Sequence, residues 1–491
     1  MLLHCHSGRA SYMLATMTPD ELYELGLNDL PALVSHTLSL QERNLTLEQS
    51  AALNSRNSSI PPGSEGFKKP KTKSLRVISG KKSGGQPGHT GATLNRVKNP
   101  DFIEIHRLSL CPCGCGRDLS AEPVINYEDR QVFDLPPQRL IVTEHKMEIK
   151  RCPVSGRLVQ APAPAGVTAP VQYGKDFLAW LVYLSTWQLL PLNRIGQMSL
   201  DLFGQEVSDD IIIKATKALN HELIPFEEAV KLLLLAAPVV GADETGLRVL
   251  KTLYWCHAVV TPELTWLGVH KKRGMKALEF FGILGHYKGR LVHDCLDMYF
   301  TLACMHAVCN AHILRELVFV YEEMKQDWAK SLHDLLLEMN KARDEQMLVD
   351  TSFPEQRLLD YSKRYDDILI EGRKVNPPII PAANTPKKRG RKKQSKAQNL
   401  LDRLEKRKVS VLAFAYDFRI PFTNNLSEQA FRMQKVKQKI SGCFRTVEGA
   451  ERFARCRSYI DTVRKQGHSI LEELKAAIIG NPFIPQPPPS G

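Results

Sequence analysis

Long apolar runs are missing from the sequence. The longest uncharged apolar stretch, Phe177 to Leu192, contains Gln188 and Pro191 and is shorter than the roughly 20 residues that a membrane-spanning helix needs. The first residues, Met1 to Thr16, carry scattered histidine and arginine side chains and lack the apolar block of a secretory signal. We therefore expect no membrane span and no signal peptide, and we expect residues 177–192 to form a buried helix.

Acidic residues are the scarcer charged group, and cysteines are few for the length. The sequence has 53 Asp and Glu against 66 Lys and Arg, which gives a formal net charge of +13. This balance favours an anionic polymer as partner, nucleic acid first, although many proteins are basic without such a partner. Eleven cysteines in 491 residues do not indicate a disulfide scaffold, so we expect a reducing, intracellular setting.

Shifts in composition and pattern divide the chain, and its length alone predicts about three domains. Overall we expect a multidomain α+β protein. The expected segments are an N-terminal helical, leucine-zipper-like region (1–53), a basic flexible linker (54–100), a zinc-ribbon-like DNA-binding module (101–165), a helical region (166–237), a mixed α/β core in two pieces (238–299 and 400–466), a helical insertion with a basic segment (300–399) and a C-terminal tail (467–491).

The N-terminal segments combine a heptad pattern with a basic linker. Leu33, Leu40 and Leu47 repeat every seven residues, which is typical of a coiled coil. An ordinary amphipathic helix explains the pattern equally well, because Pro31 interrupts it and few heptads are present. The Ser-, Pro-, Gly- and Lys-rich linker that follows cannot bury a core. Its lysines suit a phosphate-contacting arm, and a solvated linker is the plain alternative.

A crowded group of cysteines indicates a metal site within the module at 101–165. Three cysteines share one knuckle-like turn, and a second turn of this kind starts at Cys152. Paired knuckles that hold a tetrahedral metal through thiolates are the plan of a zinc ribbon. Alternating residues predict strands over 130–135 and 140–149, but Ser155 stands where the last zinc cysteine is expected. The thiolates available for zinc are those of Cys111, Cys113, Cys115 and Cys152, and His106 or His145 could join them as a ligand.

The second half of the chain begins with short apolar strands. One apolar run ends in Asp243, strands follow over 253–260 and 265–269, and a later apolar strand ends in Asp294. With a helix over 277–284, this order predicts a mixed α/β layer. Both aspartates are expected at strand ends, where ligands of open α/β sheets bind.

The helical insertion contains two features with alternative interpretations. Cys309 and His312, with His306 upstream, have metal-ligand spacing, but we favour a reduced core cysteine and a surface histidine on one helix. A Pro-Lys-Lys-Arg-Gly-Arg-Lys-Lys tract resembles an AT-hook, because a glycine between arginines suits a narrow minor groove. A nuclear-localisation-like tract or a solvated charge run would look the same. The tract's candidate DNA-binding residues are Arg389, Arg391 and Lys392.

A short motif from Asn424 to Arg432 opens a late helix. Asn425 can cap this helix with Glu428 as its third residue, so the pair matches a capping box. A carboxylate followed by cations on one helical face also suits an active site beside a phosphate backbone. The cations expected on the DNA side are Arg432, Lys435, Lys437, Lys439 and Arg445.

Asp243, Asp294 and Glu428 together suggest a catalytic carboxylate site. Two divalent metals held by three carboxylates can activate a water or a DNA 3′-hydroxyl and stabilise the leaving oxygen of a phosphoryl transfer. Mg²⁺ or Mn²⁺ prefers such oxygen ligands. Each acid alone has a structural explanation, as a turn former at a strand end or as part of a helix cap.

These motifs together resemble the insertion-sequence transposases of the IS66, TnpC type, over nearly the full length. The resemblance implies a ribonuclease-H-like core with a DDE triad at Asp243, Asp294 and Glu428, a helical insertion before the last acid, an N-terminal leucine zipper and a zinc-binding domain. Ser155 and the segment Met1 to Met17 depart from the family pattern. The motifs are Asn54 to Pro62, Gly84 to Gly91, Asp243 to Gly246, His293-Asp294, Cys309 to His312 with Arg315-Glu316, and Asn424 to Arg432.

The function that the resemblance implies is DNA transposition. Such an enzyme binds the terminal inverted repeats of its element, cuts at the ends by metal-assisted hydrolysis and joins the freed 3′-hydroxyl to target DNA. Its cofactor would be Mg²⁺ or Mn²⁺, with Zn²⁺ in the knuckle module. Expected partners are DNA, further copies of the chain, and accessory proteins of the same element, in the bacterial cytoplasm and at the nucleoid. A catalytically inactive or co-opted DNA-binding relative and a metal-dependent nuclease without strand transfer are the alternative predictions.

Overall fold

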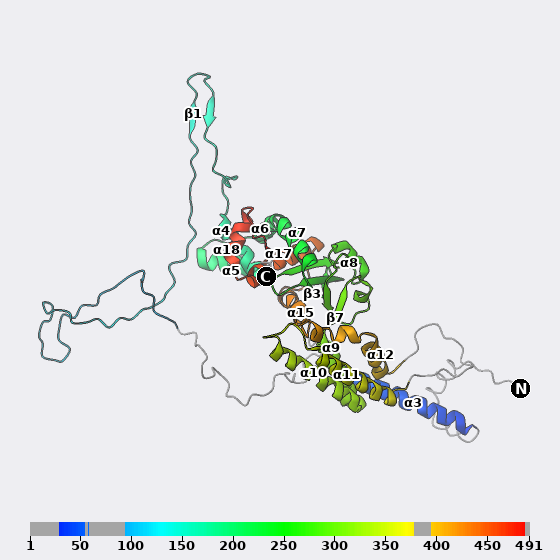
Figure 1. The fold of residues 1–491 in the computed structure, drawn as a ribbon. Helices are drawn as coiled ribbons and strands as arrows, with labels where there is room; N and C mark the ends of the chain where they lie inside the picture. Colours follow the sequence, from blue (N-terminus) through cyan, green and yellow to red (C-terminus); the bar gives the residue numbers. More distant parts are fainter. Residues whose placement is uncertain (1–28, 55–56, 58–93, 378–393, 487–491) are drawn as a thin grey trace. The chain divides into compact units, whose positions relative to one another are not determined.

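The computed structural model describes residues 29–54, 57, 94–377 and 394–486, and it is a mixed α/β structure (Figure 1). The described residues fall into two compact units. The smaller unit holds residues 94–167 with a short segment of the helical region, and the larger unit holds the remainder. The AT-hook-like tract with Arg389, Arg391 and Lys392 lies outside the described residues, as does most of the basic linker.

The N-terminal helix of the described part is α3 (Leu30–Ala51). Pro31 occupies its first turn, where proline is tolerated, so the expected interruption of the heptads by this residue is wrong. Leu38, Leu40 and Leu47 are exposed on this helix. Exposed leucines fit a coiled coil that lacks its partner and also a simple amphipathic helix, so both predictions stand.

The smaller unit has little regular structure. β1 (Ile149–Arg151) pairs antiparallel with β2 (Leu158–Gln160), and Cys152 opens the turn between them. The strands predicted over 130–135 and 140–149 are wrong except at Ile149, since the rest of these ranges forms no ladder. Alternation of apolar and polar residues was the only signal for these strands. Side chains such as Ile141 are 87% exposed, so they pack against no surface of the described residues that would stabilise a strand.

The larger unit is built on a five-stranded mixed sheet with the order β5-β4-β3-β6-β7. β3, β4 and β5 form the expected antiparallel meander, and β6 and β7 run parallel to β3. β7 was not expected, because its four residues include His306 and precede a long helix without a turn signal. The strand bounds are β3 (Val239–Val249), β4 (Thr252–Val260), β5 (Thr265–His270), β6 (Arg290–His293) and β7 (Met305–Val308).

Helices surround this sheet in two groups (Figure 1). The first group comes from the helical region and the C-terminal segment, and the second is the insertion between β7 and the late helices. The helix bounds are α4 (Lys175–Val182), α5 (Leu192–Phe203), α6 (Asp209–Glu222), α7 (Ile224–Ala236), α8 (Met275–Phe281), α9 (Asn310–Met324), α10 (Asp327–Gln346), α11 (Glu355–Val375), α12 (Lys396–Lys406), α13 (Lys408–Val411), α14 (Ala413–Tyr416), α15 (Asn425–Ala430), α16 (Arg432–Ser441), α17 (Val447–Lys465) and α18 (Ile470–Ile478).

The first group of helices buries one face of the sheet and protects its edge. Phe226 of α7 and Tyr459 of α17 meet edge to face with ring centroids 5.0 Å apart, inside a core that also contains Trp266 of β5. Ser458 Oγ and Thr462 Oγ1 of α17 accept hydrogen bonds from backbone N–H groups of β5 at 2.8 and 3.1 Å. These backbone N–H groups at the edge of β5 are therefore bonded to a helix and are not available to pair with another strand.

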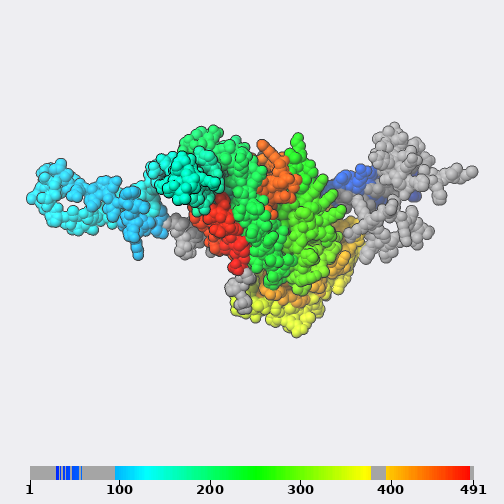
Figure 2. Space-filling view, turned by 90° about the horizontal axis from the view of Figure 1, so that it is seen from above, coloured from blue at the N-terminus to red at the C-terminus, as the bar shows by residue number. Residues whose placement is uncertain are grey.

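The C-terminal helix α18 closes the first group by packing on α4 and α6. Figure 2 shows this C-terminal segment, in red, against segments from the middle of the chain. The predicted buried helix at 177–192 is confirmed in part, because α4 and the π-helical turn Tyr183–Trp187 are largely buried there. None of the helices in the described ranges is both long and apolar enough to cross a membrane.

The insertion forms a second core beside β6 and β7. Trp328 and Leu332 of α10 and Tyr365 of α11 are buried together with Val292 and Val308 of the sheet. This shared core ties the insertion to the strands that precede it in the sequence. The late helices α13 and α14 also contact β7, which brings the chain back to the sheet just before α15.

Candidate active site

Asp243 and Asp294 lie beside each other because β3 and β6 run parallel in a fixed register. Gly241 pairs with Val292, so the two aspartates stand at equivalent positions two residues further along neighbouring strands. Asp294 directly follows the end of β6, as expected. The expected strand end at Asp243 is wrong: β3 continues to Val249 with β4 as its partner, and Asp243 instead marks the place where the parallel pairing stops.

α15 is fastened to β3 directly beside Asp243. Asn424 Nδ2 donates to the carbonyl oxygen of Ala242 at 2.8 Å, and Ser427 Oγ donates to Asn424 Oδ1 at 2.7 Å. The approach is so close that a Cβ atom on Gly241 would lie 2.5 Å from Asn424 Oδ1. Only glycine fits there without a shift. These contacts bring Glu428, the residue after Ser427, to the end of the sheet that carries the two aspartates.

The predicted helix cap is wrong by one residue. Asn424, not Asn425, is the N-cap of α15, and its side chain bonds to β3 rather than to the first helical amides. The helix also ends at Ala430, and α16 starts separately at Arg432. Glu428 and the following cations therefore do not share one continuous helical face.

Asp243 is a partly buried carboxylate with no ion-pair partner among the described residues. Burial raises the pKa of its carboxyl to about 8, and neighbouring negative charges add to this effect. A hydrogen bond from the Glu244 backbone N–H at 2.8 Å offsets a part of it. Carboxylates that repel one another in a partly dry site are stabilised by bound cations. In decreasing order, the charges that raise this pKa are those of Glu244, Asp294 and Glu428.

Glu428 is in the opposite electrostatic situation. His312 Nε2 lies 3.5 Å from Glu428 Oε1, and this contact lowers the pKa of the Glu428 carboxyl. The Cys309 sulfur completes a group in which one ligand atom from each residue lies within 4.8 Å of the others. Cys309 is a buried core cysteine, as predicted, but His312 is half-buried and contacts a candidate catalytic acid. The predicted surface histidine therefore lies only partly at the surface and contacts Glu428.

Glu244 is a site residue that sequence reasoning missed. Its side chain is completely buried, accepts from Arg273 Nε at 2.7 Å and also accepts from the Tyr299 hydroxyl. Burial raises the pKa of Glu244, and the two donors oppose that rise. The Arg273 guanidinium also stacks on Trp255, 4.8 Å from the ring centroid. This network holds the backbone next to Asp243 in place. In the sequence, the only indication of Glu244's role is that it is the second acid of the Asp-Glu-Thr triplet.

The cations expected along the DNA side divide into two groups. Arg432, Lys439 and Arg445 are exposed. Lys435 is exposed as well, but its Nζ donates to the carbonyl oxygen of Gly246 at 2.6 Å, and Lys437 Nζ stands 5.5 Å from the Phe453 ring centroid. Burial lowers the pKa of both lysines. The first group is free of such intramolecular roles in the described contacts and presents charge to solvent.

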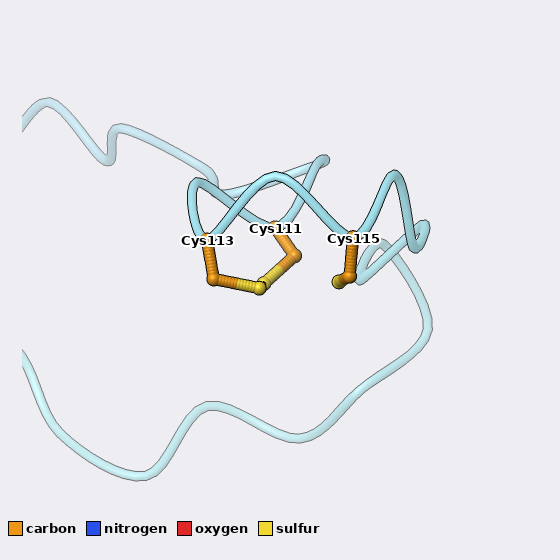
Figure 3. A group of neighbouring side chains, drawn as sticks. All are labelled: Cys111, Cys113 and Cys115. Carbon is orange, nitrogen blue, oxygen red and sulfur yellow. The ribbon is translucent and has the colours of Figure 1, made fainter.

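The cysteine knuckle of the smaller unit gathers three thiols on one side of a turn (Figure 3). Cys111 Sγ and Cys113 Sγ are 3.0 Å apart, and Cys115 lies within 4.8 Å of both. Hydrogen bonding, chiefly to Cys111, lowers the pKa of the Cys113 thiol to about 7, which favours the thiolate that a metal needs. The fit to zinc is therefore good for three ligands. Cys152 is not part of this group in the described structure.

Comparison with known families matches three parts of the chain. A model described as Transposase IS66 family matches residues 170–452, which is more than half of the chain. The chain therefore belongs to the IS66 family of transposases. The zinc-finger binding domain of transposase IS66 matches residues 109–154, a range that contains all four predicted zinc cysteines. A family of unknown function (DUF6444) matches residues 16–95.

No curated protein matches the chain. Membership of a transposase family together with a zinc-finger match implies DNA binding, and the cysteine knuckle with that match suggests Zn²⁺.

Proposed function

We propose that this protein is a DDE-type transposase that binds the terminal inverted repeats of its element, cleaves DNA there and transfers the freed 3′-hydroxyl to target DNA. The observation that carries the proposal is the convergence of three carboxylates from β3, the end of β6 and α15. Burial raises the pKa of the Asp243 carboxyl to about 8, and the charges of Asp294 and Glu428 add to that rise, as expected for acids that lie near one another. Membership of the IS66 transposase family supports the same reaction class.

The proposed core is ribonuclease-H-like. Its support is the sheet order β5-β4-β3-β6-β7, in which an antiparallel meander continues into parallel strands reached by a helical crossover. The first acid lies on the central strand, the second follows the neighbouring parallel strand, and the third lies on a helix after the insertion. We further propose that α3 mediates self-association and that the smaller unit is the zinc-containing DNA-binding module.

The residues present fit Mg²⁺ or Mn²⁺, because carboxylate oxygens are the ligands that these ions prefer and neighbouring negative charges add to the burial that raises the pKa of Asp243. Asp243 and Asp294 would hold the ions, and Glu428 would complete the site. Bound there, the ions would supply activation of the attacking hydroxyl and charge neutralisation at phosphorus. The Glu244, Arg273 and Tyr299 network would keep Asp243 in place.

The DNA backbone would be seated by the exposed cations of the larger unit. Arg432, Lys439 and Arg445 present charge without an internal partner among the described contacts, so each can neutralise a phosphate. Lys435 and Lys437 would add positive potential while holding α16 against the sheet and α17. We also propose that Arg389, Arg391 and Lys392 contact DNA, on the basis of their sequence alone.

The test compares two aspartates with matched substitutions. Asp243→Asn keeps the size of the side chain and should abolish Mg²⁺-supported cleavage of terminal-repeat DNA, while DNA binding in a mobility-shift assay survives. Asp297→Asn is the control, because Asp297 lies three residues beyond Asp294 after β6 and its side chain is 94% exposed. Cleavage by Asp243→Asn at the wild-type rate would contradict the triad.

Product analysis separates the two alternatives. A wild-type protein that shifts terminal-repeat DNA and never nicks it, with Mg²⁺ or with Mn²⁺, would be an inactive or co-opted binding protein. A protein that cuts the ends without joining them to a target would be a nuclease. Strand-transfer products between labelled terminal-repeat DNA and a target plasmid are the result that the proposal requires.

A further inference from the structure

One cluster of metal-ligating side chains lies beside the carboxylates and has a different chemistry. Cys309, His312 and Glu428 each offer one ligand atom, and these atoms all lie within 4.8 Å of one another. They include a sulfur, an imidazole nitrogen and a carboxylate oxygen. Mg²⁺ and Mn²⁺ take oxygen ligands, so neither the thiol nor the imidazole is explained by the proposed phosphoryl transfer.

Three segments that are distant in the sequence fix the cluster before any ion binds. Cys309 directly follows β7 and is held by its backbone N–H, which donates to the carbonyl oxygen of His293 at 2.8 Å. Asn310 then donates to the Phe422 carbonyl oxygen at 3.0 Å, which joins the start of α9 to the segment before α15. The Asn424 backbone N–H donates to Cys309 Sγ at 3.1 Å. These hydrogen bonds join the start of α9, which carries Cys309, to the segment that leads into α15, which carries Glu428.

The surroundings of the sulfur suit a thiolate that forms on metal binding. Burial, together with the Glu428 charge, raises the pKa of the Cys309 thiol, while backbone N–H groups of Asn424, Ala311 and His312 interact with the sulfur and lower that pKa. The open side of the cluster is the Glu428 carboxylate, whose side chain is 38% exposed, so an ion can enter from solvent. A ligand set of one thiolate, one imidazole and one carboxylate with an open position is one that Zn²⁺ accepts.

We propose that Cys309, His312 and Glu428 form a binding site for a borderline-soft divalent cation, with Zn²⁺ as the preferred ion. This site is separate from the cysteine knuckle of the smaller unit and shares only Glu428 with the carboxylate group. If Glu428 serves in catalysis as proposed above, Zn²⁺ held by Cys309 and His312 competes with Mg²⁺ for that carboxylate. Zn²⁺ then inhibits DNA cleavage reversibly, and this consequence rests on the proposed function.

The binding test uses the full-length protein and Co²⁺ as a spectroscopic substitute for Zn²⁺. Wild-type protein and two variants, Cys309→Ser and His312→Gln, are titrated while thiolate-to-cobalt absorption is recorded, and total bound Zn²⁺ is then measured. We expect each variant to bind one ion fewer than wild type and Cys309→Ser to lose part of the thiolate band. Cys456→Ser, a change of another buried cysteine in α17, should behave like wild type.

His312→Gln should fold like wild type, because this side chain is only partly buried and glutamine can still hydrogen-bond. A loss of metal in this variant is therefore not explained by misfolding. Equal metal stoichiometry in wild type, Cys309→Ser and His312→Gln would overturn the proposed site, whatever the protein does to DNA. Loss of one ion in both variants supports it even if the protein never cleaves DNA. The binding arm is therefore independent of the proposed function.

The second measurement is inhibition of Mg²⁺-supported cleavage by added Zn²⁺. Loss of even an outer partner of a metal ligand costs roughly 10- to 100-fold in metal affinity, so loss of a ligand should weaken inhibition at least as much. We expect His312→Gln to need correspondingly more Zn²⁺ for half-inhibition, and chelation of Zn²⁺ to restore wild-type cleavage. Identical inhibition of wild type and variant would refute the competition while leaving the binding result intact.

Discussion

Replacing Gly241 by alanine would test whether the contact between β3 and α15 places Glu428 in the active site. The added Cβ would lie 2.5 Å from Asn424 Oδ1 and 2.6 Å from Ser427 Oγ, which is well inside van der Waals contact. Neither side chain can turn away without loss, because Asn424 bonds both to Ala242 of β3 and to Ser427. We therefore expect α15 as a whole to move away from the sheet.

The size of the effect follows from this geometry. Overpacking of a close-packed contact costs about 1–3 kcal/mol, and we expect the free energy of unfolding to fall by about that amount. Cleavage should suffer more, because a displacement of about 1 Å at a reacting group can cost roughly 100-fold in rate. DNA binding should change little, since the exposed cations lie on other segments.

The assay pairs unfolding in urea with Mg²⁺-supported cleavage of terminal-repeat DNA. Gly285→Ala is the matched control, because a Cβ there meets no atom within 4 Å. Gly241→Ala should unfold at lower urea concentration than the control and cleave far more slowly at a concentration where both are folded. If the two variants unfold and cleave alike, the close approach of α15 to β3 does not position Glu428.

Three further predictions concern charge and metal. The pKa of Asp243 is raised to about 8 in the folded state, so between pH about 4 and 8 the folded state binds more protons than the unfolded chain. The free energy of unfolding of the metal-free protein should therefore fall as the pH rises toward 8. Urea unfolding should show this slope in wild type and not in Asp243→Asn. Arg273→Ala leaves the buried Glu244 carboxylate with one donor fewer and should lower the free energy of unfolding by about 1–3 kcal/mol, whereas Arg273→Lys should lower it less. Ser155→Cys restores a second knuckle with Cys152 and should raise zinc affinity in competition with a chelator, which an unchanged affinity would contradict.

The sheet was largely predictable from the sequence, and the limits of that prediction have physical causes. The antiparallel strands and β6 are runs of apolar residues, and the structure confirms them. β7 was not predicted, because a four-residue strand that includes a histidine shows no periodic pattern of apolar residues. The bounds of β3 were missed since Glu244, Thr245 and Gly246 look like a strand end, although they continue pairing with β4.

Prediction of the site was weaker because its geometry depends on contacts between distant segments. The three carboxylates were predicted from their motifs and from the family resemblance. The register of β3 and β6 alone accounts for the positions of Asp243 and Asp294 side by side. Tyr299 and Arg273 carry no local signal of their roles, and the spacing of His312 from Cys309 does not reveal its contact with Glu428. Each acts on an acid that lies far away in the sequence: Tyr299 and Arg273 on Glu244, and His312 on Glu428. No periodicity encodes such pairs.

The motif around Asn424 shows why one residue of error in a helix cap matters. α15 spans only Asn425–Ala430, which is too short to be stable through helix propensity. It is held instead by Asn424 on β3, by the buried Ser427 and by Phe431, which is 4% exposed. A capping asparagine would have oriented Glu428 relative to its own helix. Because Asn424 bonds to the strand that bears Asp243, it orients Glu428 relative to the sheet, which is the frame that a site built from both acids requires.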